Sequence, residues 1–140
     1  MNPAPVDMRF VLDASVVITW AMRDEAQPQA DLAFSCLQVG SAIVPGIWWY
    51  EVRNTLIVNE RRGRIDPADS IQFLRDLDAF QIDVQFPQDE FQLIGLARKH
   101  NLSVYDAAYL ALAMREHLPL STLDERLESA ARIEGVGLLV

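Results

Sequence analysis

Short apolar segments alternate with longer segments of helical periodicity along this 140-residue chain. Strands are expected at residues 9–12, 42–44, 82–84, 118–123 and 136–140, with a brief one at 102–103. Helices are expected over 14–21, 28–39, 47–60, a segment opened by Asp66-Pro67, a segment from Pro87 to about 100, 104–117 and 124–133. Strands separated by helices predict an α/β three-layer sandwich, with a central, mostly parallel sheet flanked by helices. The length suits one domain, residues 9–140, after a flexible lead at 1–8.

Four acidic residues stand at positions where a carboxylate needs an explanation. Asp13 closes the apolar run of the first strand, Asp106 and Asp124 stand at the starts of helices, and Glu51 lies within a helix among apolar neighbours. Ligands of parallel sheets bind outside the carboxyl ends of the strands. Asp13 and Asp124 should reach that edge, Asp106 should reach it after the brief strand at 102–103, and Glu51 must come across from its helix. A carboxylate placed against a core needs a compensating cation.

The donor types indicate which cation such a site would take. Four carboxylates offer oxygen ligands, which suit a hard cation such as Mg²⁺ or Mn²⁺. The chain holds only two histidines, His100 and His117, and one cysteine, Cys36, at spacings that do not match a zinc site. The sequence therefore predicts a magnesium or manganese site at one edge of the sheet.

Helix capping is an alternative explanation for three of these acids. Asp13 is placed to cap the helix that begins at the next residue. Ser103-x-x-Asp106 has the pattern of a capping box, and Thr122-x-x-Glu125 has the same pattern with Asp124 in the first turn. Taken singly, each of these acids is explained by capping.

Glu51 is not explained in this way. It shares a helix face with Ile47, Asn54 and Val58, and that face should be half-buried. Arg53 lies on another face, so a partner for the Glu51 carboxylate must come from elsewhere in the chain. The joint placement of four acids favours a metal site over capping alone.

The charge balance limits how the chain could meet a nucleic acid. Twenty acidic and 12 basic residues give a net charge of −8, which argues against non-specific coating of a phosphate backbone. Two bound divalent cations would change −8 to −4, and a local basic patch could still contact phosphates. Arg61, Arg62 and Arg64 supply such a patch, although a solvated helix end explains them equally well. The chain has no apolar stretch long enough to span a membrane, and the single Cys36 fits a reducing cytoplasm.

Four ordered stretches resemble the PIN-domain family, and most closely its small VapC-type toxins. These stretches are Val11-Leu-Asp13-Ala-Ser15, Pro45 through Glu51-Val-Arg-Asn54, Val104-Tyr-Asp106-Ala-Ala-Tyr109-Leu-Ala-Leu-Ala113, and Ser121-Thr-Leu-Asp124-Glu-Arg-Leu127. The resemblance spans Phe10 to Val140. It implies a PIN-like fold and a cytoplasmic, Mg²⁺-dependent endoribonuclease that is the toxin of a type II toxin–antitoxin pair. It also implies a homodimer and a cognate antitoxin whose tail blocks the site.

The same resemblance assigns roles to particular residues. It implies that Asp13, Glu51, Asp106 and Asp124 are the catalytic and metal-binding acids, and that Ser15, Asn54 and Thr122 support them. The expected reaction is hydrolysis of an RNA phosphodiester by a water that the metal activates, with Arg61, Arg62 and Arg64 as candidate RNA contacts. Two alternatives remain: a catalytically silent PIN-like binding module, and a response-receiver domain. The only lysine, Lys99, is near a helix end and fits the receiver pattern poorly.

Overall fold

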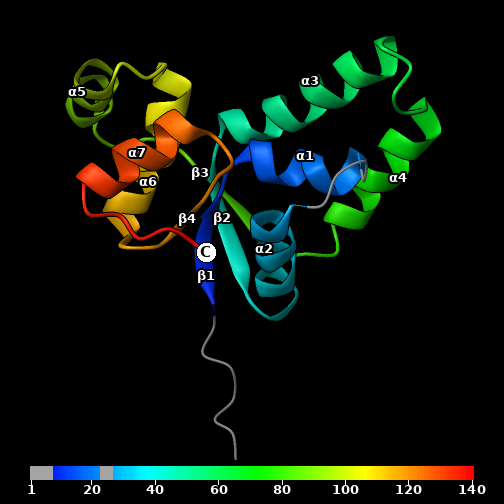
Figure 1. Ribbon diagram of the computed structural model, residues 1–140, viewed down its shortest axis with the longest axis horizontal. Helices are drawn as coiled ribbons and strands as arrows, with labels where there is room; N and C mark the ends of the chain where they lie inside the picture. Colours follow the sequence, from blue (N-terminus) through cyan, green and yellow to red (C-terminus); the bar gives the residue numbers. More distant parts are fainter. Residues whose placement is uncertain (1–7, 23–26) are drawn as a thin grey trace, which may run out of the picture.

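The computed structural model describes residues 8–22 and 27–140. The first half of the described chain contains β1 (Arg9–Leu12), α1 (Ala14–Met22), α2 (Pro28–Val39), β2 (Ser41–Pro45), α3 (Ile47–Arg61) and α4 (Pro67–Leu77). The second half contains β3 (Ile82–Gln85), α5 (Glu90–His100), α6 (Val104–Glu116), β4 (Leu120–Ser121) and α7 (Glu125–Ile133). Figure 1 shows a central sheet from which the helices spread to both sides.

The four strands form a parallel sheet in the order β3-β2-β1-β4. The central strands carry continuous apolar sequence because both of their faces are covered. In β1, Phe10, Val11 and Leu12 are fully buried, and every residue of β2 is buried. β3 is partly exposed, as expected for a strand at the edge of the sheet. All strands point the same way, so their carboxyl ends meet at one edge.

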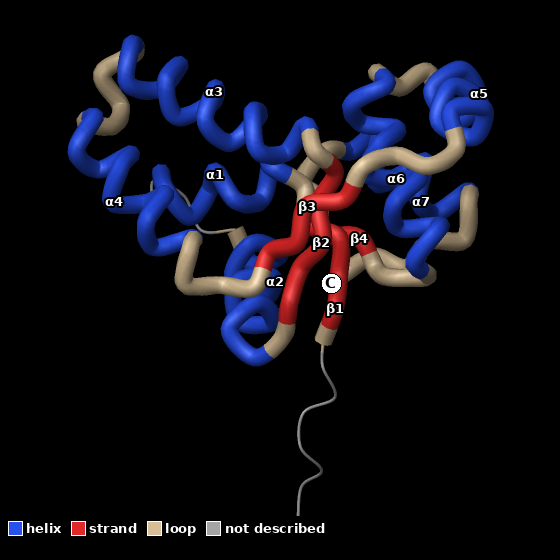
Figure 2. Tube along the Cα trace, turned by 180° about the vertical axis from the view of Figure 1, so that it is seen from behind, coloured by secondary structure: helices blue, strands red, loops and turns tan. Residues whose placement is uncertain are grey.

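The helices form the two outer layers. Figures 1 and 2 show α1 to α4 on one side of the sheet and α5 to α7 on the other. Helix α6 packs directly on the sheet, and α5 and α7 pack on α6. Helices α1 and α3 pack against each other on the opposite side, and both begin at the edge where the strands end. The expected α/β sandwich with a parallel centre is therefore confirmed.

Two expected strands are not formed as the sequence suggested. Residues 102–103 are a tight connection between α5 and α6, because Asn101 is left-handed and Ser103 already caps α6. The expected strand at 136–140 makes only an isolated bridge between Leu138 and Leu120, and β4 covers two residues where six were expected. The expected lead falls mostly on residues 1–7, which lie outside the described residues. In the described ranges, no helix is both long and apolar enough to cross a bilayer.

Candidate active site

Asp13 is the deepest acid at the carboxyl edge of the sheet. It follows β1 directly, and its backbone N–H donates to the Ser121 carbonyl of β4 at 3.0 Å. Its side chain is 5% exposed. The hydroxyls of Ser15 and Thr122 both donate to Asp13 Oδ2 at 2.7 Å. A buried carboxylate is thus held in place by two neutral hydroxyls, and no basic side chain of the described residues pairs with it.

The same two hydroxyls tie the loop after β4 to the start of α1. Ser15 Oγ accepts the Leu123 N–H at 3.1 Å, and Thr122 Oγ1 accepts the Asp124 N–H at 3.0 Å. Each hydroxyl therefore donates to Asp13 and accepts from the backbone of the loop. Ser15 and Thr122 thus lie beside Asp13, and their supporting role in a reaction stays a prediction.

Burial raises the pKa of Asp13 above its ordinary value, and the nearby charge of Asp106 raises this pKa further. The hydrogen bonds from Ser15 and Thr122 lower it in part. Desolvation disfavours the charged form of a carboxyl group, whereas donors that bind the carboxylate favour it. The ionised Asp13 is therefore held at a free-energy cost that a nearby positive charge would relieve.

Glu51 reaches the same region from α3, and its partner is Tyr109. The Tyr109 hydroxyl donates to Glu51 Oε1 at 2.6 Å and accepts the Ala14 N–H at 3.4 Å, so it joins α3, α6 and the start of α1. Burial raises the pKa of Glu51, and the charges of Asp13 and Asp106 add to this increase, while the Tyr109 hydrogen bond lowers it. Helical spacing placed Arg53 on another face of α3, so that the partner of Glu51 had to come from elsewhere in the chain. Tyr109 of α6 is that partner.

Asp106 reaches the site from the first turn of α6. Ser103 caps this helix, since its hydroxyl accepts the Asp106 N–H at 3.0 Å. Burial and the charge of Asp124 raise the pKa of Asp106, and a hydrogen bond with Ser103 lowers it in part. The expectation that a strand at 102–103 carries Asp106 to the edge is wrong, because the capped start of α6 does so instead.

Asp124 has the capping role that the sequence left open. Its Oδ1 accepts the N–H groups of Arg126 and Leu127 at 2.9 and 3.1 Å, so Asp124 itself is the N-cap of α7. Thr122, which the sequence offered as the cap, instead holds Asp13. Asp124 nevertheless lies close enough to Asp106 to raise its pKa. Capping and membership of the acidic group therefore coexist at this residue.

The acidic residues are neighbours, although they do not form a closed cage. The charge of Asp106 raises the pKa of Asp13 and of Glu51, Asp13 also raises the pKa of Glu51, and Asp124 raises the pKa of Asp106. Within residues 8–22 and 27–140, none of these four acids forms an ion pair with a basic side chain. In the same ranges, no group of three or more His, Cys, Asp or Glu side chains is arranged so that it could hold a metal ion as placed.

The remaining predicted residues lie farther from the acids. Asn54 is exposed, one turn beyond Glu51 on α3. Arg61, Arg62 and Arg64 are exposed around the end of that helix. Ten residues separate Glu51 from Arg61, or roughly 15 Å along a helix axis. A ligand that contacts both the acids and this basic patch would need to extend along α3.

Tyr109 is the site residue to which the sequence reasoning gave no role. Its neighbours on α6 are apolar, and helical spacing alone assigns it to the core, where its ring is indeed fully buried. The available signal was its position three residues after Asp106, on the same side of the helix. A buried tyrosine needs a partner for its hydroxyl, and the orphaned Glu51 carboxylate was the complementary requirement.

Comparisons with known proteins agree with this arrangement. The PIN domain family model matches residues 10–133. Ribonuclease VapC3 from Pyrobaculum aerophilum is 33% identical over 126 residues, which cover 86% of this chain and 92% of that protein. The crystal structure of PAE2754 from Pyrobaculum aerophilum has the same fold, with a TM-score of 0.68 and 23% identity over 91% of this chain and 87% of that one. The chain is therefore a member of the PIN-domain family, of the VapC type.

Proposed function

We propose that this protein is a Mg²⁺-dependent endoribonuclease and the toxin of a type II toxin–antitoxin pair. The observation that carries the proposal is the group formed by Asp13, Glu51 and Asp106, whose pKa values are raised together and which have no basic partner among the described residues. Perturbed carboxyl groups that converge at the carboxyl edge of a parallel sheet are typical of catalytic sites. The similarity to a protein named Ribonuclease VapC3 supports RNA as the substrate.

The donor set fits Mg²⁺, with Mn²⁺ as an alternative. All candidate ligands are carboxylate oxygens, which both ions prefer. Mg²⁺ keeps several of its waters and binds through one or two carboxylates together with substrate phosphates. It therefore does not require the closed cage that the described residues lack. We expect Asp13 and Asp106 to be the main direct ligands, and Glu51 and Asp124 to bind a second ion or orient water.

The chain's own residues would prepare the site for this ion. Ser15 and Thr122 fix the orientation of the Asp13 carboxylate through hydrogen bonds to Oδ2. Tyr109 fixes Glu51 in the same way across two helices. When bound, a divalent cation would supply a readily deprotonated water and offset the charge that develops on the phosphate. None of these side chains needs to act as a nucleophile.

The partners of the proposed toxin follow from its family. We propose a cytoplasmic homodimer whose cognate antitoxin covers the acidic site in the resting state. We also propose that the exposed Arg61, Arg62 and Arg64 contact RNA phosphates beyond the scissile bond. Their distance from Glu51, roughly 15 Å along α3, would place these contacts several nucleotides from the cut.

An Asp13→Asn variant tests the function directly. This change keeps the shape of the side chain and removes its charge, so we expect Mg²⁺-dependent cleavage of RNA to be lost while the circular dichroism spectrum is unchanged. Asp69→Asn, at an exposed position in the first turn of α4, is the matched control and should cleave like the natural chain. Full activity of purified Asp13→Asn would refute the assignment. Mg²⁺ binding without cleavage by the natural chain would indicate a silent binding module.

A further inference from the structure

A small apolar cavity opens between α3, α6 and the segment that follows β3. Its volume is about 260 Å³, and its walls include Ile47, Tyr50, Phe86, Tyr105 and Ala108. This volume lies just below the range of roughly 300–1,000 Å³ that is usual for pockets that hold whole small molecules. The cavity is therefore large enough to accommodate one planar ring system.

The wall of the cavity includes the sequence neighbours of two of the acids. Tyr50 precedes Glu51 on α3, and Tyr105 precedes Asp106 on α6. The hydrogen bond from Tyr109 to Glu51 joins the same two helices. Residues four apart share a helix face, so Ile47 in the cavity wall is directly adjacent to Glu51. A group in the cavity would therefore lie next to a ligand held by the acids.

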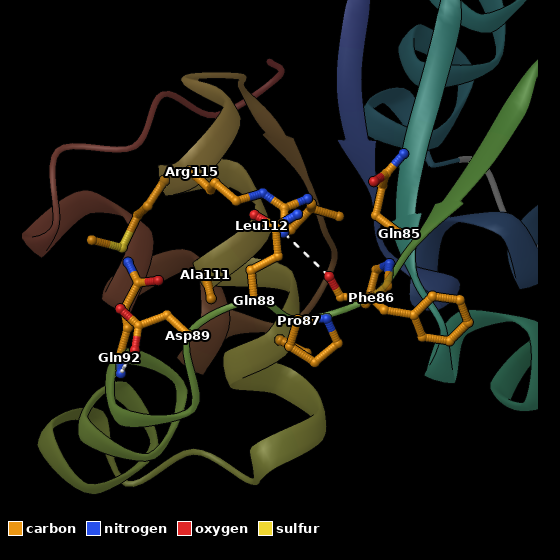
Figure 3. A pocket seen from close by; sticks show the side chains of 12 residues that line it. Gln85, Phe86, Pro87, Gln88, Asp89, Gln92, Ala111, Leu112 and Arg115 are labelled. Atoms are coloured by element: carbon orange, nitrogen blue, oxygen red, sulfur yellow. Dashed lines mark hydrogen bonds between the residues drawn. The ribbon is translucent and has the colours of Figure 1, made fainter.

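Three aromatic side chains at the cavity are strongly exposed: Tyr50 is 66% exposed, Phe86 71% and Tyr105 58%. The position of Phe86 is fixed from two sides. An added Cβ at Gly46 would come within 2.9 Å of Phe86 Cε1, so the ring lies against the start of α3. Arg115 donates to the Phe86 carbonyl at 3.2 Å, and Figure 3 shows the ring turned away from Arg115. Phe86 is thus held in place from two sides, although all three rings are exposed to solvent.

A second, larger cavity lies on the other side of this segment and has a different character. Its volume is about 430 Å³, and polar side chains of the β3–α5 segment and Arg115 line part of it (Figure 3). None of the four acids lines it. None of the four acids lines the aromatic cavity either, but Tyr50 and Tyr105 in its wall directly precede Glu51 and Asp106, so it is the cavity nearer to the proposed chemistry.

The charge of the chain decides what the aromatic cavity can bind with useful affinity. Proteins usually bind single strands through a basic groove together with aromatic rings on which bases stack. This chain has a net charge of −8, so phosphate contacts contribute little on their own. Stacking of a base on an aromatic ring contributes binding free energy that does not depend on the net charge of the chain. A protein partner would need about 20–30 residues per side for a stable interface, which is far more than surround this cavity.

We propose that the aromatic cavity is a stacking subsite for one unpaired nucleobase of single-stranded RNA, beside the phosphodiester held at the acidic group. This proposal rests on the proposed nuclease function and extends it to the form of the substrate. Tyr50 and Tyr105 present the faces on which the base stacks, and Phe86 closes the side toward β3. A base inside a duplex is not available for such stacking, so the site selects loops and single strands.

Binding and cleavage are measured separately to test this subsite. Short RNAs that carry the fluorescent base 2-aminopurine at successive positions are bound to the Asp13→Asn chain, in which we expect no cleavage. We expect quenching at one position. In the same background, Tyr50→Ala and Tyr105→Ala should abolish that quenching and weaken binding by about 5- to 100-fold each. Tyr50→Phe and Tyr105→Phe retain the ring and should bind like their parent. Phe91→Ala removes an 88% exposed ring outside the cavity and is the matched control.

An RNA that lacks one base tests whether the tyrosines act on that base. In the otherwise natural chain, an abasic site at the quenched position should reduce kcat/KM, and it should cause little further loss in Tyr50→Ala. Equal losses in both proteins would overturn the proposal, as would natural binding by both alanine variants. Conversion of a dimer into a monomer by Tyr50→Ala, with RNA binding unchanged, would overturn it in favour of a protein interface. Tyrosine-dependent quenching by a chain that does not cleave RNA would support the subsite and refute the nuclease.

Discussion

Replacing Tyr109 with phenylalanine removes one buried oxygen at a junction of α1, α3 and α6. The ring itself is fully buried and remains in place, so packing is conserved. Two hydrogen bonds are lost: the 2.6 Å bond to Glu51 Oε1 and the 3.4 Å bond from the Ala14 N–H. The second is longer than the usual range of about 2.7–3.2 Å and contributes little. The effect of the change therefore reports mainly on the bond to the carboxylate.

The magnitude follows from the charge of the acceptor. A hydrogen bond to a charged group contributes about 1.5–3 kcal/mol to the free energy of unfolding. We expect Tyr109→Phe to lower this free energy by about 2 kcal/mol when Glu51 is ionised. At roughly 3 °C per kcal/mol for a chain of this size, Tm should fall by about 6 °C. Tyr50→Phe removes an exposed hydroxyl and should change stability by less than about 0.5 kcal/mol.

The pH dependence gives a sharper test. The Tyr109 bond lowers the pKa of Glu51, so it favours the ionised carboxylate. The difference between the natural chain and Tyr109→Phe should therefore be complete at high pH and shrink as the pH falls through the titration of Glu51. Urea unfolding in EDTA at pH 7.5 and pH 4.5 measures this difference. A destabilisation equal at both pH values, or none at pH 7.5, would refute an ionised Glu51 as the acceptor.

Two further predictions concern the stability of the whole chain. Hydrogen bonds from Lys99 and His100 lower the pKa of Glu134, so its contribution is present above the ordinary glutamate pKa and is lost as the pH falls through the lowered value. Glu134→Gln should therefore lower the free energy of unfolding by about 1 kcal/mol or less at pH 7, with a smaller effect in acid; an undiminished effect at pH 3 would contradict this. Saturating Mg²⁺ should raise Tm, by roughly 8 °C at a hundred times its Kd, and a differential scanning fluorimetry trace of Asp13→Asn that rises equally would place the ion elsewhere.

The alternation of strands and helices could be predicted from the sequence because it depends on local sequence. A continuous apolar run predicts β1, and Pro28 and Pro67 predict where α2 and α4 begin. Neither prediction depends on the rest of the chain. The strands expected at 102–103 and 136–140 depend on whether a neighbouring strand is available for pairing. Ser103 instead caps α6, and residues 136–140 make only a single bridge to β4, at Leu138. Apolar composition alone does not carry that information.

The acids of the candidate site stood out in the sequence, but Tyr109 and the hydrogen bonds that connect the site did not. Asp13 and Glu51 stood out because a charge in an apolar context needs a partner. The partners themselves are distant in sequence: Thr122 reaches Asp13 across 109 positions, and Tyr109 reaches Glu51 across 58. Such pairs follow from the packing of α6 and β4 against the rest of the fold. A sequence pattern identifies the requirement for a partner, and the tertiary structure decides which residue meets it.

Asp124 caps α7, and this role does not exclude the proposed part in catalysis. A carboxylate has two oxygens, and only Oδ1 of Asp124 accepts the N–H groups of α7. Asparagine caps helices as well as aspartate does, whereas alanine does so poorly, at a cost of about 1 kcal/mol. Asp124→Asn should therefore keep the stability of the chain and Asp124→Ala should reduce it, while both reduce Mg²⁺-dependent RNA cleavage. Urea unfolding and cleavage rates measured on the same two variants separate the roles. Natural cleavage by Asp124→Asn would leave capping as the sole function of this residue and confine the catalytic group to Asp13, Glu51 and Asp106.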